Sequence, residues 1–138
     1  MSKKELRNKV IELLSKTSFF GGIAREDIDF FIEKLIERSY SAGENIFEEG
    51  ETTEDSYLLL EGEVKAVVGG RTADKFYPGM FFGIIAQVGI PKHLATAIAD
   101  TDIILVVIPK TTLSLLEKQK PELYGKIILK MWKDTSNC

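Results

Sequence analysis

The residues with the clearest chemical potential lie between Phe76 and Asp100, in the stretch FYPGMFFGIIAQVGIPKHLATAIAD. Gly79 and Gly83 allow backbone conformations that a Cβ would obstruct, and a short helix after Gly83 would present N–H groups that suit an anion. This stretch therefore predicts a phosphate-binding turn. The alternative is an ordinary turn that binds nothing, since a glycine before a helical turn is a frequent pattern.

The residue types give little support for catalysis or for metal binding. The chain has one histidine, His93, and one cysteine, Cys138, at its very end. A metal-binding cupin barrel needs several histidine ligands, and a nucleophilic triad needs a base beside its nucleophile. We therefore expect a protein that is not an enzyme and that holds no metal and no cofactor.

Length and charge limit the class of protein further. With 138 residues, 44% of them hydrophobic, the chain is the size of one domain with a proper core. The net charge is −3, and the span from Glu44 to Glu63 holds acidic residues but no Lys or Arg, which would repel a nucleic-acid backbone. Apolar runs fall short of the ~20 residues of a membrane span. We expect a cytoplasmic protein that contacts neither nucleic acid nor membrane directly.

The spacing of apolar residues predicts two helices at the start of the chain and two at its end. The first runs from Lys3 to Lys16, and the second runs from Glu26 to about Arg38. A third helix is capped by Thr111 or Thr112, and the last has Pro121 in its first turn.

Between these helices, glycines recur at intervals of about one strand plus one turn, which is typical of a β-sandwich or barrel. Ser56 to Leu60 is nearly all apolar, as in a strand buried on both faces, and Gly69-Gly70 suits a two-residue hairpin turn. The predicted strands comprise residues 56–60, 63–68, 71–76, 94–99 and 103–108.

The last helix carries two apolar rows, one of Leu123, Ile127 and Met131 and one of Tyr124, Ile128 and Trp132. An apolar arc this wide is difficult to bury against one small sheet. Either both rows are covered within the chain, or they form the seam of a homodimer. We predict a homodimer that forms through this helix.

The order of elements and a series of short motifs resemble the cyclic nucleotide-binding domain family, which includes bacterial catabolite-activator effector domains, kinase regulatory subunits and gated-channel tails. The matching residues are Phe20 with Ile23, Gly43-Glu44-Asn45-Ile46, Glu49-Gly50-Glu51, Tyr57 to Gly62 followed by Val64, Tyr77-Pro78-Gly79, Phe82-Gly83, Ala95-Thr96-Ala97 and Pro121-Glu122-Leu123. The resemblance covers about residues 19–129. It implies a mainly β fold, a β-roll or jelly-roll sandwich with flanking helices. The expected parts of this single domain are an N-terminal helix (1–18), the β-roll (19–120) and a C-terminal helix (121–138).

In that family the stretch from Phe76 to Asp100 would be the phosphate-binding cassette, with a Phe-Gly-Glu lead, a short helix, and an Arg before an Ala-Thr pair. The family Glu accepts from the ribose 2′-hydroxyl, and the Arg pairs with the phosphate. Here Ile84 stands at the Glu position and His93 at the Arg position. The candidate ligand-binding residues are Phe82, Gly83, Ile84, Ile85, Ala86, Lys92, His93, Ala95 and Thr96.

These two replacements should weaken nucleotide binding. Imidazole and ammonium cannot reproduce the paired donors of a guanidinium, and losing such a partner costs ~2–5 kcal/mol, or roughly 1.5 to 4 orders of magnitude in affinity. The resemblance thus implies a regulatory, ligand-sensing domain with weak or absent binding of cyclic AMP and cyclic GMP. Protonated His93 or a nearby Lys92 would be a partial substitute. If neither substitutes, His93 is an ordinary turn residue after Pro91, and Ile84 is a core residue that caps the empty pocket.

Two other functions stay open. The chain could be a degenerate domain kept for dimerisation or protein interaction, or it could sense a different, less polar ligand. The helix-turn-helix that follows the long helix in bacterial relatives does not occur before Cys138. We therefore expect a stand-alone domain whose output, if any, comes from a separate protein.

Overall fold

The computed structural model describes residues 1–16, 19–52, 54–83 and 92–133. Within them the chain forms four helices: α1 (Lys3–Ser15), α2 (Arg25–Glu33), α3 (Lys110–Gln119) and α4 (Pro121–Lys133). The strands are β1 (Ile36–Tyr40), β2 (Asn45–Phe47), β3 (Ser56–Glu61), β4 (Val64–Val68), β5 (Arg71–Phe76), β6 (Phe81–Phe82), β7 (Thr96–Ala99) and β8 (Ile103–Ile108).

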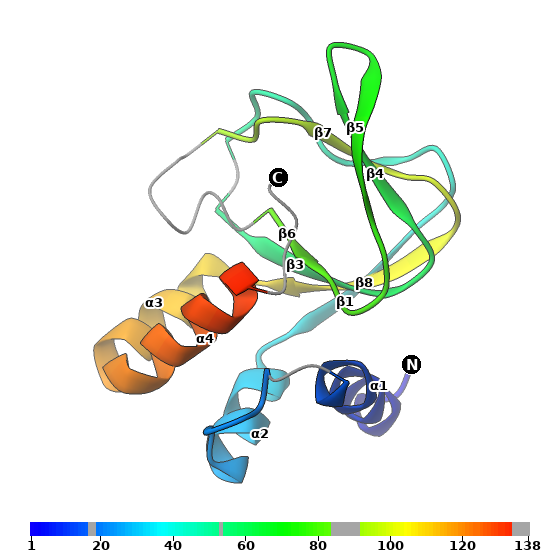
Figure 1. The fold of residues 1–138 in the computed structure, drawn as a ribbon. Coiled ribbons are helices and arrows are strands. Elements are labelled where there is room, and N and C mark those ends of the chain that lie inside the picture. Colours follow the sequence, from blue (N-terminus) through cyan, green and yellow to red (C-terminus); the bar gives the residue numbers. More distant parts are fainter. Residues whose placement is uncertain (17–18, 53, 84–91, 134–138) are drawn as a thin grey trace.

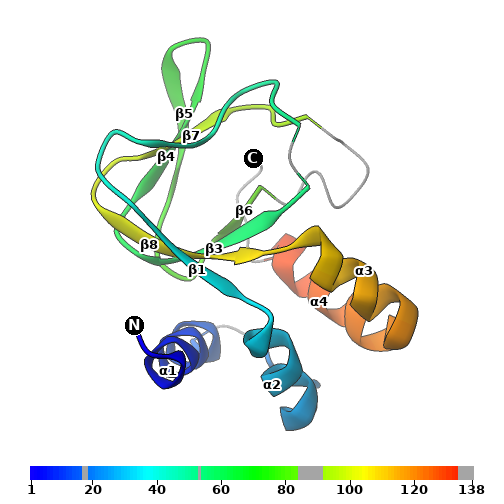
Figure 2. The same cartoon turned by 180° about the vertical axis from the view of Figure 1, so that it is seen from behind.

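The strands form two antiparallel sheets that face each other. One has the order β1-β8-β3-β6, and the other has the order β2-β7-β4-β5. Seen from opposite sides in Figures 1 and 2, the four helices lie on one side of this roll, next to the sheet that contains β1, β3 and β8. That sheet therefore separates two layers of apolar side chains.

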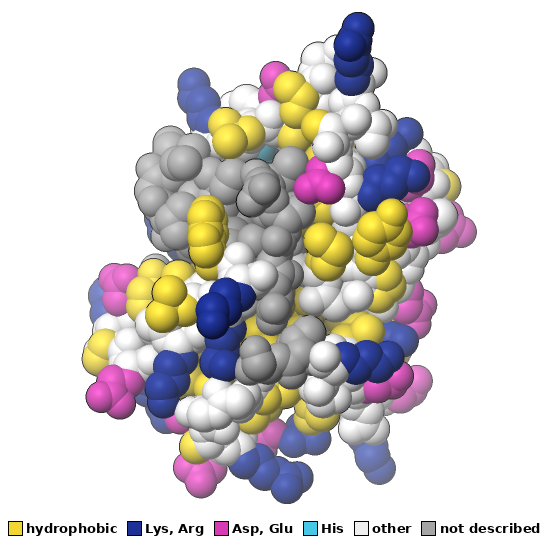
Figure 3. Space-filling view, viewed as in Figure 1, with side chains coloured by type: hydrophobic (Ala, Val, Ile, Leu, Met, Phe, Trp, Pro, Cys, Tyr) yellow, Lys and Arg dark blue, Asp and Glu magenta, His cyan; other side chains and the backbone are white. Residues whose placement is uncertain are grey.

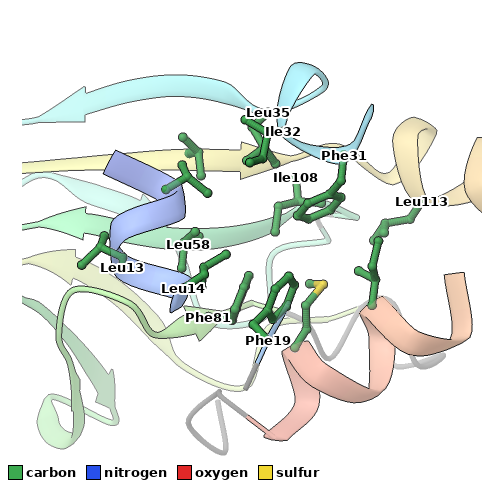
Figure 4. Packing of buried hydrophobic residues seen from close by; sticks show 14 of the residues in the cluster. Leu13, Leu14, Phe19, Phe31, Ile32, Leu35, Leu58, Phe81, Ile108 and Leu113 are labelled. Atoms are coloured by element: carbon green, nitrogen blue, oxygen red, sulfur yellow. The ribbon is translucent and has the colours of Figure 1, made fainter. Parts of the chain in front are cut away.

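The layer between this sheet and the helices is the helix-side core (Figure 4). Its buried members are Val10, Leu13, Leu14, Phe19, Phe31, Ile32, Leu35, Leu58, Leu60, Phe81, Val106, Ile108, Leu113, Leu116, Leu123, Ile127 and Met131. The layer between the two sheets is the roll interior, made of Phe47, Tyr57, Leu59, Val64, Ala66, Phe76, Phe82, Ala95, Ala97, Ala99, Ile103, Leu105 and Val107.

Strand β3 contributes to both layers. Leu58 and Leu60 pack in the helix-side core, while Tyr57 and Leu59 pack in the roll interior, because successive side chains of a strand point to opposite faces. This confirms the prediction of a strand buried on both faces. The β4–β5 hairpin is confirmed too, since Val68 pairs with Arg71 across Gly69-Gly70.

Two of the predicted helices are confirmed at their starts. At the first turn of α1 the Glu5 amide donates to Ser2 Oγ at 3.1 Å, and the Ser2 amide donates to Glu5 Oε1 at 3.4 Å. This capping box satisfies backbone donors that have no partner inside the helix. α4 begins at Pro121, as expected of a residue that lacks an N–H and suits a first turn.

The predicted end of the second helix near Arg38 is wrong. α2 ends at Glu33, and Ile36 lies in β1, where it is paired with Val107 of β8. Leu35 and Ile36 continued the helical spacing by coincidence. Most of β1 is exposed, so it lacks the alternation that marks a half-buried strand.

The predicted cap of the third helix at Thr111 or Thr112 is also wrong. α3 begins at Lys110. Its N-cap residue is Pro109, whose side chain accepts no hydrogen bond from the helix. Instead, the Lys110 amide donates to Asp55 Oδ1 at 3.1 Å, from the segment just before β3. A carboxylate distant in sequence therefore takes the role that a local hydroxyl was expected to play.

Candidate ligand-binding site

The first half of the candidate site begins in β6. Phe82 is paired with Tyr57 of β3, and its ring lies 5.2 Å from the Tyr57 ring and 5.0 Å from the Phe76 ring, centroid to centroid. Gly83 follows with φ +73°, and a Cβ at this position would lie 2.9 Å from Cδ2 of Tyr57. The chain therefore leaves β6 against the Tyr57 ring, where a residue with a side chain would be strained and crowded.

Three of the nine candidate residues, Ile84, Ile85 and Ala86, fall in residues 84–91 and lie outside the described part of the chain. The short helix expected after Gly83 lies there as well. The binding of an anion by the N–H groups of that helix remains a prediction.

Lys92 is exposed and forms an isolated antiparallel bridge with Thr52. The next residue, His93, donates its amide to the Glu51 carbonyl at 3.0 Å, and its own carbonyl accepts from the Gly50 amide at 2.8 Å. This part of the candidate cassette, at Lys92 and His93, is thus held by backbone hydrogen bonds to the loop between β2 and β3.

The side chain of His93 is buried, with only 6% of its surface exposed. Its ring is stacked on Phe47 of β2, with 3.6 Å between ring centroids and 15° between planes. Burial lowers the pKa of His93 below its ordinary value of 6.5, although the nearby Glu51 carboxylate acts in the opposite direction. The ring is therefore mainly neutral at pH 7.

The remaining candidates lie in and before β7. Ala95 is buried in the roll interior, and Thr96 Oγ1 accepts a hydrogen bond from the Glu49 amide at 2.9 Å. Ala97 and Ala99 of β7 are buried in the roll interior as well. This strand edge is therefore tied to the loop that also holds His93.

An aromatic cluster connects these residues. Phe47 is the common neighbour, since its ring is stacked on His93 and lies 5.6 Å from the Tyr57 ring and 6.2 Å from the Phe82 ring. The sequence pattern did not indicate Phe47, because it ends a three-residue strand with no motif of its own. Its position beside the only histidine of the chain is visible only in three dimensions.

The candidate dimer helix divides into a buried row and a partly exposed row. Leu123, Ile127 and Met131 belong to the helix-side core, so they are covered by the chain itself. In the second row Tyr124 and Ile128 are half-buried, and Trp132 is 51% exposed. Leu129, which the sequence did not single out, is 67% exposed. The face of α4 that carries Leu129 and Trp132 is therefore the one that is open to a partner.

On the face in Figure 3, Lys and Arg side chains are spread over the surface rather than gathered in one patch. Among the residues that the structure describes, no three His, Cys, Asp or Glu side chains come together as metal ligands. None of the described helices combines the length and apolar character needed to cross a membrane.

The fold and the site together define a β-roll binding domain with flanking helices. The sequence model of the cyclic nucleotide-binding domain family matches residues 37–119, which is more than half of the chain. The chain belongs to this family, and both the resemblance seen in its motifs and the predicted fold class are confirmed.

Two curated relatives are similar to the chain. A cyclic AMP receptor protein from Thermus thermophilus is 31% identical over 88 residues, which are 60% of this chain and 41% of that protein. A cAMP-dependent protein kinase regulatory subunit from Eremothecium gossypii is 25% identical over 99 residues, 72% of this chain and 22% of that protein. The chain thus spans less than half the length of these relatives.

Among solved structures, a cyclic nucleotide-binding domain from Methylobacillus flagellatus has a TM-score of 0.83 at 19% identity. The match covers 96% of this chain and 76% of that structure. At this identity the likeness establishes the fold, and the ligand has to be argued from the site.

Proposed function

We propose that this chain is a regulatory, ligand-sensing domain without enzymatic activity that binds cyclic AMP and cyclic GMP weakly or not at all. The observation that carries the proposal is the state of His93, which stands where the family cassette has its arginine. The ring is buried on Phe47, and burial lowers its pKa, so it is mainly neutral at pH 7. A neutral imidazole offers a cyclic phosphate neither the charge nor the paired donors of a guanidinium.

The sequence at Ile84 supports the same proposal for the ribose. An apolar side chain at the position of the family glutamate has no acceptor for a 2′-hydroxyl. A ligand that places a hydroxyl there would leave it without a partner, at a cost of about 1–3 kcal/mol. A less polar ligand would avoid that cost, so we retain such a ligand as the alternative occupant.

Calorimetric titration with cyclic AMP and cyclic GMP, carried to millimolar ligand at pH 6 and pH 8, tests the proposal. We expect no saturable heat at pH 8 and at most weak binding at pH 6, where a larger fraction of His93 is protonated than at pH 8. Micromolar binding at pH 8 would refute it. The double variant Ile84→Glu with His93→Arg is the positive control, and it should raise affinity at least tenfold.

By analogy with the receptor protein and the kinase regulatory subunit, we propose that ligand occupancy is passed to an output protein. Such coupling requires that the ligand bind two conformations of the domain with different affinity. The proposed output partner is a separate polypeptide, and the acidic span from Glu44 to Glu63 argues against direct contact with nucleic acid.

A second candidate function is that of a dimerisation module. It is favoured by Leu129 and Trp132, two large apolar side chains of α4 that are more than half exposed. Exposed apolar residues gathered on one element mark an interaction surface more often than residues scattered singly. In this function the candidate cassette would bind no ligand, and the face of α4 that carries Leu129 and Trp132 would be the functional surface.

A further inference from the structure

A separate cavity lies on the helix side of the molecule, between α1 and α2. It has a volume of about 630 Å³, and ligand pockets in proteins commonly measure ~300–1,000 Å³. Its walls come from the first two turns of α1, from α2, and from the turn that leads to β1. None of its lining residues belongs to the candidate cassette, so its occupant would be independent of the roll interior.

The floor of this cleft is apolar. Ile32 and Leu35 are buried members of the helix-side core, where Figure 4 labels both, and they also line the cleft. Leu6, the first member of the apolar stripe of α1, is only half-buried, whereas the later members of the stripe are covered. Leu6 is therefore the apolar side chain that the cleft leaves partly open to water, and a hydrocarbon chain placed there would cover it together with the edges of Ile32 and Leu35.

The rim of the cleft carries four basic side chains, Lys3, Lys4, Arg7 and Lys34, and two carboxylates, Asp29 and Glu33, so its charge is positive on balance. Lys3 and Lys4 stand in the first turn of α1, and Lys34 stands at the C-cap of α2 with its Nζ 5.3 Å from the centre of the Phe30 ring. Asp29 of α2 forms an ion pair with Arg7 of α1 across the cleft. That pair neutralises one rim carboxylate and links the two helices.

We propose that this cleft binds a small anionic amphiphile, a single carboxylate on an unbranched hydrocarbon chain such as a medium-chain fatty acid. The hydrocarbon lies on Leu6, Ile32 and Leu35, and the carboxylate faces the lysines of the rim. Ammonium groups suit such a head because they act as point charges and impose no fixed geometry. The combination of a positive rim and an apolar floor, in a chain of net charge −3, selects for an anion that also has a tail.

Methyl NMR of the full chain, titrated with hexanoate, octanoate and decanoate, tests this inference. We expect saturable shifts at the methyl groups of Leu6, Ile32 and Leu35, with affinity rising about threefold for each added methylene. Added salt should weaken binding, because the head group is held by exposed charges. Neutral 1-octanol should bind more weakly than octanoate.

Matched lysine variants test the head-group contact. The double variant Lys3→Gln with Lys4→Gln should weaken octanoate about tenfold, whereas Lys9→Gln, also on α1 but outside the cleft lining, should leave it unchanged. Leu6→Gln should flatten the dependence on chain length. If Leu6→Gln fails to fold, the double variant Lys3→Gln with Lys4→Gln still tests whether the head group is bound in the cleft.

Three results would overturn the inference: no saturable shift with decanoate, shifts confined to the roll interior, or shifts produced only by phosphatidylglycerol vesicles. The cyclic nucleotide titration reports on the roll interior and the fatty acid titration on the cleft. Failure of one therefore leaves the other standing.

Discussion

At the scale of single residues, the burial of His93 makes the stability of the domain depend on pH. Its pKa is lowered in the folded chain, so between its ordinary value of 6.5 and the lower folded value the unfolded chain binds more protons. The stability contributed by the neutral ring is therefore present above pH 6.5 and is lost as the pH falls through that window.

Urea unfolding of the wild type and of His93→Phe at pH 7.5, 6.5 and 5.5 measures this contribution. Phenylalanine keeps an aromatic ring against Phe47 but cannot take up a proton. We expect the wild type to lose stability relative to the variant as the pH falls. Parallel pH profiles would show that His93 does not carry the acid sensitivity.

A second residue-scale prediction concerns Gly62, between β3 and β4. It has φ +86°, and a Cβ there would lie 2.7 Å from Thr101 Oγ1 and 2.8 Å from Ile103 Cγ2. Gly62→Ala should cost about 3 kcal/mol or more in unfolding free energy, from both backbone strain and crowding. Gly50→Ala is the matched control, because Gly50 has φ +81° but no neighbouring atom within 4 Å of its Cβ, and it should cost about 1 kcal/mol. Equal losses in chemical denaturation would exclude crowding as the cause.

At the scale of elements, two lysines tie α2 and the turn before it to the C-terminal helices. Lys120, between α3 and α4, forms an ion pair with Asp27 of α2 at 2.8 Å, and its Nζ lies 5.7 Å from the centre of the Phe30 ring. Lys126 of α4 donates to the Gly22 carbonyl at 3.1 Å. These contacts hold α2 and the start of α4 in one arrangement.

We expect Lys120→Met to lower the unfolding free energy by about 1 kcal/mol, since the ion pair is partly exposed and the cation–π contact adds a similar small amount. Lys118→Met, a change of an exposed residue in the last turn of α3, should have no measurable effect. A double-mutant cycle with Asp27→Asn separates the ion pair from the ring contact. A coupling energy of zero would mean that Asp27 contributes nothing to the link.

At the scale of the whole molecule, the open face of α4 predicts a dimer. Leu129 and Trp132 are 67% and 51% exposed, and covering both would remove a large apolar area from water. Sedimentation velocity of the wild type should show a dimer. The double variant Leu129→Glu with Trp132→Glu should shift it to a monomer, raising the dissociation constant at least 100-fold.

The matched control for this test is Ile36→Glu on β1. Ile36 is also a large exposed apolar residue, but it lies on a sheet edge away from α4. The variant should sediment like the wild type. A wild-type monomer at all concentrations, or equal dissociation in both variants, would argue against a seam on α4.

The sequence by itself determined the elements whose patterns are local. Alternation, apolar runs and turn residues predicted β3, the β4–β5 hairpin and β8, and the helical spacing predicted α1 and α4. The motifs spread along the chain determined the family and therefore the roll. The local patterns can be read from the sequence because backbone geometry sets the strand and helix periods within a few residues.

Only the tertiary structure decided the rest. It ended α2 at Glu33, because the following residues pair with β8, about 70 positions further along the chain. It chose the row of α4 that is buried, since both rows are equally apolar and only packing against the helix-side core distinguishes them. It buried His93 against Phe47, a neighbour supplied by another strand. The charge of that histidine depends on this burial, and burial is a property of the assembled fold rather than of any stretch of sequence.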